Sequence, residues 1–477
     1  MTFTTPTFLI FLVVVWVLYW SLSRRWQNRL LVVASLVFYG WWDPRFVLLL
    51  LFTATVDYWV ALALQSTELA GKRKRLLAVS LACNLGVLGF FKYFNFFANS
   101  AERSAAALGW HLDPFILSII LPVGISFYTF QALSYTIDVY RGRLPAVRDF
   151  VDYLGFITFF PQLVAGPIER ATNLLVQFQH ERRFDSDAAA DGARQMLWGF
   201  FKKMVVADTM APLVGAAFDN PQAASGWQLL WATYAFAIQI YCDFSGYTDI
   251  AIGCARFFGF KLMRNFAYPY FSESIPEFWR RWHISLSTWF RDYLYFPLGG
   301  NRVGSARRAL NVLIVFAVSG LWHGANWTFV VWGVLHGCLY LAYVRLWPAS
   351  HDRTRDLVAE QSILPGPARL LRIALTFQLV CISWVYFRAA SVGEAHLILR
   401  RIATDLVSGG FEPPPSGRAV ALLIGVILVE WLARLQQHGL TIGAWPRPLR
   451  HAAYYALVGG ILLLADLTHI PFIYFQF

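Results

Sequence analysis

The chain has 477 residues, of which 57% are hydrophobic and only 14% are charged, against roughly a quarter charged in an ordinary soluble domain. This composition excludes a typical soluble protein, and the 41 Phe, 20 Trp and 21 Tyr exclude a disordered chain, which has far less apolar surface to bury. The net charge of +12 does not call for a nucleic-acid partner, because basic residues gather in the cytoplasmic loops of membrane proteins. The five cysteines form no C-x-x-C pair, so we predict neither a disulfide framework nor a metal site.

Apolar segments of about 20 residues, the length that crosses a bilayer, recur from one end of the chain to the other. The first segment has no basic flank before it and no clear cleavage site after it, so we interpret it as a retained span and not as a signal peptide. We predict spans near 7–23, 29–41, 46–65, 76–97, 114–137, 195–218, 227–256, two within 309–344, 370–387, 418–436 and 452–470.

These spans predict an all-α integral membrane protein with eleven or twelve transmembrane helices. No soluble block separates them, so we predict a single membrane domain over residues 1–477. Within it, peripheral spans lie in 1–100, a core in 114–345 and C-terminal spans in 368–477.

Basic residues are divided unevenly between the loops that join the first spans. The loops that we assign to the inside hold ten of them, Arg24, Arg25, Arg29, Lys72, Arg73, Lys74, Arg75, Arg141, Arg143 and Arg148. The intervening loops hold two, Arg45 and Arg103. Because Lys and Arg accumulate on the cytoplasmic side, we predict an outside N-terminus and an inside Lys72 to Arg75 cluster.

The run from Phe150 to Ala165 is too short and too broken to cross a bilayer. Asp152, Gly155 and Pro161 interrupt it. Irregular backbone at membrane depth is tolerated only where protein or a water-filled cavity satisfies it. We therefore predict a re-entrant segment beside an internal cavity.

The stretch from Lys261 to Arg308 combines aromatic residues with arginines. Its apolar residues Phe278, Trp282, Leu286, Trp289 and Tyr293 recur at spacings of three or four, which predicts one helix with a single apolar stripe. The arginines lie off that stripe, so the helix is expected to lie at the membrane interface.

Familiar catalytic motifs are missing: the sequence has no G-x-S-x-G elbow, no G-x-x-x-x-G-K loop, no H-E-x-x-H helix and no G-x-G-x-x-G turn. The remaining candidates are polar groups inside apolar spans, where each is costly and therefore a functional candidate. His323 lies in an uncharged stretch that spans residues 309–344, and a histidine can take and return a proton near neutral pH. Its alternative role is a hydrogen bond between helices.

Several other polar residues have two interpretations. Asn326 follows His323 by three residues, which predicts the same helical face, and His336 lies on the return limb and either contacts a ligand or bonds a carbonyl. Asp243 and Asp249 form a proton relay or ion site, or they cap a helix broken around Gly246.

Two further predictions concern charged or titratable side chains beside these spans. Lys202 and Lys203 interrupt a span, and we expect them to snorkel. His283 lies beside Arg280 and Arg281 and faces a cavity or lipid.

The chain resembles the membrane-bound O-acyltransferases, specifically the branch of bacterial polysaccharide O-acetylases typified by the alginate O-acetylase membrane subunit. The resemblance covers most of the chain. It rests on Leu121 to Tyr128, Ala165 to Ile168, Asp243 to Tyr247, Phe278 to Tyr295 and Gly320 to Gly324.

The resemblance implies a fold in which about eleven helices surround a tunnel, with re-entrant and interfacial pieces. It implies that His323 is the catalytic histidine and that His283 is the second functional one. Around them we predict donor or substrate contacts from Arg280, Arg281, Trp282, Trp322, Asn326 and His336.

These features predict an O-acetyltransferase of the bacterial inner membrane. It would take the acyl group from cytosolic acetyl-CoA, with no permanently bound cofactor, and deliver it through a periplasmic partner protein to a polysaccharide hydroxyl. The acceptor stays open, because relatives acetylate alginate, cellulose or peptidoglycan, and a sister branch moves D-alanine from a carrier protein onto teichoic acid. The alternatives are a phosphopantetheine carrier as donor, or a proton-coupled transporter built on the same buried polar groups.

Overall fold

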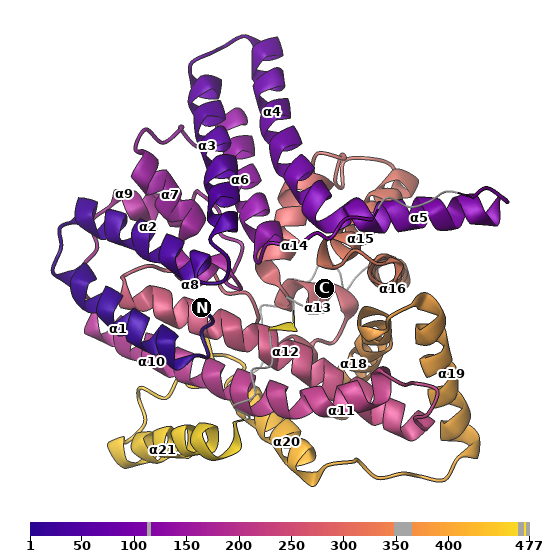
Figure 1. The fold of residues 1–477 in the computed structure, drawn as a ribbon. Helices are drawn as coiled ribbons and strands as arrows, with labels where there is room; N and C mark the ends of the chain where they lie inside the picture. Colours follow the sequence, from indigo (N-terminus) through magenta and orange to yellow (C-terminus); the bar gives the residue numbers. More distant parts are fainter. Residues whose placement is uncertain (112–115, 348–364, 466–471, 474–477) are drawn as a thin grey trace. The chain divides into compact units, whose positions relative to one another are not determined.

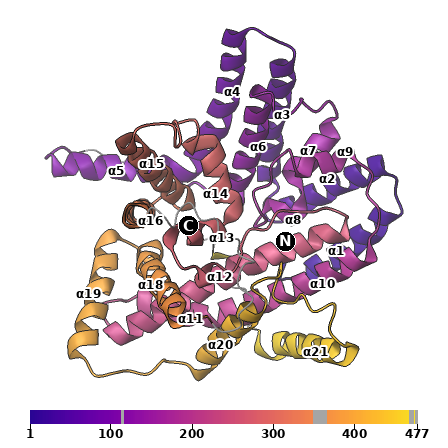
Figure 2. The ribbon, with the colours of Figure 1, turned by 180° about the vertical axis from the view of Figure 1, so that it is seen from behind.

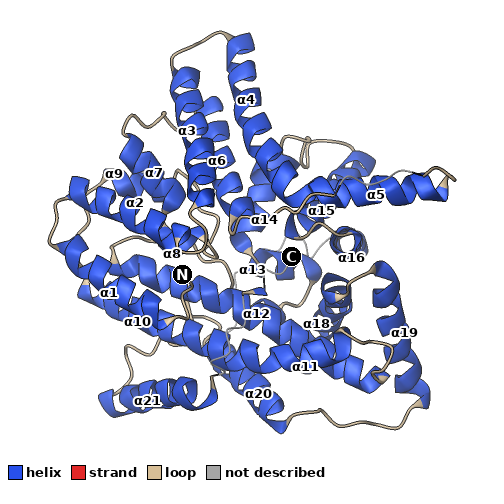
Figure 3. Cartoon of the chain, viewed as in Figure 1, coloured by secondary structure: helices blue, strands red, loops and turns tan. Residues whose placement is uncertain are grey.

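The computed structural model describes residues 1–111, 116–347, 365–465 and 472–473. Within these ranges the regular elements are helices, joined by loops (Figure 3). The chain divides into two compact units, residues 1–189 with 254–263, and residues 190–253 with 264–477. The prediction of one domain over the whole chain stays a prediction.

The first unit contains the N-terminal helices, drawn from indigo to purple in Figure 1. Its elements are α1 (Pro6–Trp20), α2 (Arg24–Gly40), α3 (Arg45–Gln65), α4 (Ala70–Leu88), the π-helical turn η1 (Gly89–Tyr93), α5 (Phe94–Ala107), α6 (Ile125–Tyr140), α7 (Phe150–Thr158), α8 (Phe160–Leu163) and α9 (Leu174–Gln179). Helices α3, α4 and α6 lie side by side (Figures 1 and 2). The carboxylate of Asp57 on α3 joins the three helices, because Ser80 and Asn84 of α4 and Thr136 of α6 all donate hydrogen bonds to it.

The second unit carries the candidate site. Its elements are α10 (Ser186–Phe200), which begins in the first unit, η2 (Phe201–Ala207), α11 (Asp208–Phe218), α12 (Gly226–Phe257), η3 (Pro269–Phe271), α13 (Ile275–Arg281), α14 (Ile284–Phe290), η4 (Arg291–Tyr295), α15 (Ser305–His323), α16 (Trp327–Leu346), α18 (Pro367–Arg388), α19 (Val392–Ser408), α20 (Gly417–Leu432) and α21 (Arg447–Leu464).

In the part of the chain that the structure describes, four helical segments are long and apolar enough to cross a membrane: Arg45–Gln65, Ala70–Ala107, Trp327–Leu346 and Pro367–Arg388. The prediction of a helical membrane protein is thereby confirmed in its coarse form, whereas the total of eleven or twelve spans stays a prediction. The predicted division of 309–344 into two helices is confirmed, because α15 ends at His323 and α16 begins at Trp327.

Helices α15 and α16 pack closely because glycines remove the side chains between them. A Cβ on Gly320 of α15 would overlap the backbone carbonyl of Phe329, and a Cβ on Gly333 of α16 would overlap the carbonyl of Phe316. The hairpin therefore holds the end of α15, where His323 lies, against the start of α16.

Four predictions about local structure are wrong. The helix predicted over 278–293 is divided into α13 and α14, because His283 between them has a left-handed backbone. Helix α12 runs unbroken through Gly246, where the missing side chain lets the carbonyl of Gly199 approach. The span predicted at 114–137 begins only at Ile125. Residues 388–418, between two predicted spans, where no helix is predicted, contain α19.

The segment predicted as re-entrant forms two short helices, α7 and α8. They meet at Phe159, whose backbone is not helical, and Pro161 lies in the first turn of α8. The predicted interruption of this segment is confirmed. Its depth in a membrane stays a prediction.

Candidate active site

His323 is the last residue of α15, directly before the turn that Gly324 begins. Its side chain is buried among aromatic rings. The centroid of its imidazole lies 5.1 Å from the ring of Trp322, 5.1 Å from that of Trp332 and 5.5 Å from that of Phe387. The helix ends here because the backbone of Gly324 is extended. The ring of Phe329 lies so close to Gly324 that a Cβ at this position would overlap it.

His283 lies between α13 and α14 in the left-handed region, with φ 44° and ψ 54°. A non-glycine residue held there costs about 1–3 kcal/mol and is often found at a functional site. The side chain is fully buried, and its imidazole packs 4.8 Å from the ring of Phe244.

The structure brings the two predicted histidines together. The imidazole centroids of His283 and His323 are 6.2 Å apart, and Trp322 packs against both rings. Burial lowers the pKa of His283 from 6.5 to about 3, so its imidazole is neutral at physiological pH. One ring nitrogen then donates a hydrogen bond and the other accepts one.

Tryptophans enclose this pair on the side of α16 and α18. The rings of Trp332 and Trp384 stack 5.7 Å apart, and Trp282 contacts Trp384 at 5.1 Å. All three are fully buried. Trp282 and Trp322, which the sequence predicts as contact residues, therefore form walls of the site.

His336 is separated from His323 by the ring of Trp332, whose centroid is 5.1 Å from each imidazole. The indole N–H of Trp279 donates to His336 Nδ1 at 3.3 Å. Nε2 therefore carries the hydrogen and donates to Ser383 Oγ at 2.7 Å, because that hydroxyl in turn donates to the carbonyl of Val380. Protein groups satisfy both nitrogens, which favours a packing role. The predicted ligand contact stays a prediction.

Asn326 caps the N-terminus of α16: its Oδ1 accepts from the backbone N–H of Thr328 at 3.1 Å, and its Nδ2 donates to the carbonyl of Ala390 at 3.0 Å. The prediction that it shares a helical face with His323 is wrong, because α15 ends before it. Arg281 is buried and forms an ion pair with Glu277 at 2.5 Å. Arg280 is exposed and is the one of this pair that could reach an external anion.

The lysines predicted to snorkel are buried instead. Lys202 Nζ lies 2.7 Å from Asp249 Oδ2, and Lys203 Nζ lies 2.8 Å from Asp208 Oδ1 and 3.1 Å from Asp243 Oδ1. These contacts rule out the interpretation of the two predicted carboxylates as caps of a broken helix. They are partners of buried cations.

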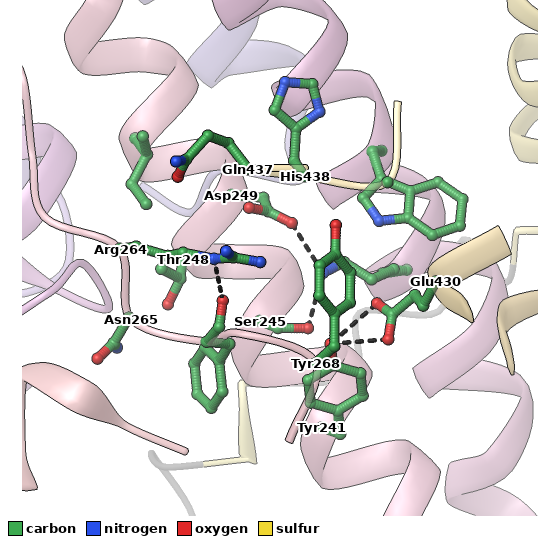
Figure 4. A pocket seen from close by; sticks show the side chains of 15 residues that line it. Tyr241, Ser245, Thr248, Asp249, Arg264, Asn265, Tyr268, Glu430, Gln437 and His438 are labelled. Atoms are coloured by element: carbon green, nitrogen blue, oxygen red, sulfur yellow. Dashed lines mark hydrogen bonds and ion pairs between the residues drawn. The ribbon is translucent and has the colours of Figure 1, made fainter. Parts of the chain in front are cut away.

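Lys202 and Asp249 line a small polar cavity of about 20 Å³ (Figure 4). Lys202 also donates to Ser245 Oγ at 2.8 Å. Across the cavity, the hydroxyl of Tyr241 lies 2.9 and 2.8 Å from the two carboxylate oxygens of Glu430. Sequence reasoning missed Glu430, although a lone carboxylate in the apolar segment 418–436 was a signal that could have found it.

Several known proteins are similar to this chain in sequence. The model of the membrane-bound O-acyltransferase family, MBOAT, matches residues 143–360. The chain is 37% identical to a probable alginate O-acetylase AlgI of Pseudomonas putida over the full length of both. It is 42% identical to that of Pseudomonas aeruginosa over 83% of this chain and 73% of the relative. It is 36% identical to a peptidoglycan O-acetyltransferase of Helicobacter pylori over 83% of this chain and 79% of the relative.

These similarities confirm the resemblance drawn from the motifs, and with it the prediction of an O-acyltransferase. The histidine pair lies inside the matched region. The chain belongs to the membrane-bound O-acyltransferase family.

Proposed function

We propose that this protein transfers an acetyl group from acetyl-CoA to a hydroxyl for the O-acetylation of an extracellular polysaccharide. The observation that carries this proposal is the buried pair of His323 and His283, whose rings are 6.2 Å apart. The printed names of the relatives, alginate O-acetylase and peptidoglycan O-acetyltransferase, support a polysaccharide acceptor.

In the proposed reaction, His323 is the general base. It removes the proton of the acceptor hydroxyl as the oxygen attacks the thioester carbonyl, a role that typically contributes 10²–10⁴-fold. A C–O bond forms and the C–S bond breaks, so the products are the ester and the thiol. The proton taken by His323 returns to the leaving thiolate, and the overall reaction neither consumes nor releases a proton.

The oxygen that becomes negative in the tetrahedral intermediate is proposed to be stabilised by hydrogen-bond donors beside the histidine pair. His283 is proposed to orient the thioester with its neutral, buried ring. The indole N–H groups of Trp332 and Trp384 find no acceptor among the described residues, so either could donate to the same acyl group.

The donor's phosphates are expected to bind exposed arginines that lie within residues 280–308. Arg280, Arg291, Arg302, Arg307 and Arg308 are exposed. Charge-assisted hydrogen bonds from guanidinium groups suit phosphate. The alternative, in which they only retain the orientation of the protein, predicts that their removal leaves the KM for acetyl-CoA unchanged.

We propose further that the protein lies in the bacterial inner membrane with several spans and that a periplasmic partner protein completes delivery to the polymer. A hydroxyl presented from outside and a thioester presented from the cytosol would then meet at His323. Whether the first acceptor is a hydroxyl of the partner or of the sugar is decided by the experiment below.

Thiol release by the protein reconstituted in lipid, with a periplasmic extract as acceptor source, tests this proposal. With acetyl-CoA as donor, we expect release that requires the extract, and labelled acetyl in polymer or in a partner protein. Release only from an acyl-loaded phosphopantetheine carrier would contradict acetyl-CoA as donor. Proton flux without release from either donor would contradict acyl transfer and support a transporter.

A further inference from the structure

The left-handed backbone of His283 is held on both sides by one segment, residues 265–267. Before His283, the backbone N–H of Ala267 donates to the carbonyl of Arg281 at 2.9 Å. After it, the backbone N–H of Ile284 donates to the carbonyl of Asn265 at 2.9 Å. These two hydrogen bonds lie on either side of His283, whose φ is 44°. They stabilise its backbone and so offset part of the cost of the left-handed conformation.

The side chain of Asn265 makes a second connection to the same place. Its Oδ1 accepts from the backbone N–H of Ser285 at 3.2 Å and from the Ser285 hydroxyl at 2.9 Å. One of the N–H groups that a helix N-terminus leaves without an intrahelical partner is thereby satisfied by a side chain from another segment. Asn265 therefore helps to cap α14, whose N-cap residue is His283.

Ser285 carries this contact on to the imidazole. Its Oγ lies 3.5 Å from His283 Nδ1, and its hydrogen already points to Asn265. The hydroxyl can therefore offer only a lone pair to the ring. This favours the tautomer with hydrogen on Nδ1, which leaves Nε2 as an acceptor.

The other end of the Asn265 side chain reaches the polar cavity of Figure 4. Asn265 is fully buried, and its Nδ2 has no acceptor among the described residues. An unsatisfied buried donor costs about 1–3 kcal/mol. The cavity, about 20 Å³ in volume, is large enough for one water molecule.

We propose that Asn265 is a positioning residue for catalysis: it holds the backbone and the ring tautomer of His283 through Ser285, and it anchors this arrangement to a water in the polar cavity. The charged and titratable groups around that cavity are Lys202, Tyr241, Asp249, Arg264, Tyr268, Glu430 and His438. The imidazole of His323 faces His283 itself, with the two ring centroids 6.2 Å apart. The role of Asn265 in catalysis rests on the proposed acyl transfer. The contacts of Asn265 that hold the backbone of His283 and the start of α14, here called the clamp, do not depend on that function.

Four variants in the thiol-release assay test this inference. Asn265→Asp keeps the acceptor oxygen at Oδ1 and Asn265→Ala removes it. Ser285→Ala breaks the link to the imidazole, and Ser287→Ala removes a hydroxyl from the same helix whose partner is the carbonyl of Trp282. We expect kcat to fall at least 10-fold in Asn265→Ala and Ser285→Ala. The KM for the donor should stay within about 2-fold, and Ser287→Ala should resemble the natural protein. Asn265→Asp should retain at least 10-fold more activity than Asn265→Ala.

Equal kcat values for Ser285→Ala and Ser287→Ala would overturn the positioning role while leaving the proposed function intact. If instead the natural protein shows no transfer that depends on His323, the proposed function fails. The clamp is then tested separately, by the melting temperatures of the Asn265 variants. The clamp predicts that Asn265→Ala melts lower than Asn265→Asp. Equal melting temperatures would overturn it.

Discussion

At the scale of single residues, His283 combines a left-handed backbone with a fully buried imidazole. Neither property can be seen in the sequence around it, where the spacing of apolar residues indicates one continuous helix. His323 was recognisable, because it lies in a stretch without charged residues and its motif resembles that of a known family. Asn265 was not recognisable, since its contacts with the start of α14 arise only when two segments meet in the folded chain.

The neutral state of His283 predicts how stability depends on pH. Its pKa falls from 6.5 to about 3 on folding, so the unfolded chain binds more protons between these values. The contribution of His283 to stability is therefore complete above pH 6.5 and is lost as the pH falls, by about 1.4 kcal/mol per pH unit. We expect His283→Asn, whose side chain tolerates the left-handed backbone, to lose less stability than the natural protein between pH 7 and pH 5. Chemical unfolding in detergent at both values measures this. Parallel losses in the two proteins would contradict a neutral buried imidazole.

At the scale of elements, the hairpin of α15 and α16 was predicted from one uncharged stretch of residues 309–344 and is present in the structure. Length and composition were sufficient, because 36 residues without a charged side chain exceed what one span needs. The break between α13 and α14 depends on contacts from residues 265–267, which the pattern does not contain. Helix α19 was missed because its charged residues resemble those of a loop.

The close approach of these two helices makes Gly320 sensitive to substitution. We expect Gly320→Ala to lower the melting temperature and the activity together, because its Cβ would overlap the carbonyl of Phe329 and overpacking typically costs about 1–3 kcal/mol. The matched control is Gly425→Ala in α20, where the added Cβ meets nothing within 4 Å. Since alanine favours a helix over glycine, the control should melt at or above the natural temperature. A Gly320→Ala protein that melts like the control would contradict the close packing of the hairpin.

The buried pair of Lys202 and Asp249 connects η2 with α12. We expect Lys202→Met to destabilise the protein by about 3–5 kcal/mol, because it leaves a carboxylate buried beside Glu430. Lys202→Met combined with Asp249→Asn should recover part of that loss, since both charges are then absent. Denaturant unfolding of the two variants provides the comparison, and equal stability would show that the pair is not coupled.

At the scale of the whole molecule, the distribution of basic residues predicts which end of each span faces the cytosol. The segment Ala70–Ala107 offers a direct test, because Lys74 and Arg103 lie near its two ends and both are exposed. In a protein without other cysteines, we expect Arg103→Cys to react with a membrane-impermeant thiol reagent in intact cells. Lys74→Cys should react only after permeabilisation. The reverse pattern would contradict the predicted orientation.

The central claim is that His323 removes the proton of an acceptor hydroxyl during acyl transfer. The most direct measurement compares transfer of labelled acetyl from acetyl-CoA by the natural protein, by His323→Ala and by His396→Ala. The last of these removes an exposed histidine of α19 from the same unit. We predict that His323→Ala still unfolds cooperatively but loses 10²–10⁴-fold in kcat, whereas His396→Ala keeps its activity. Transfer by His323→Ala at the natural rate would contradict the claim.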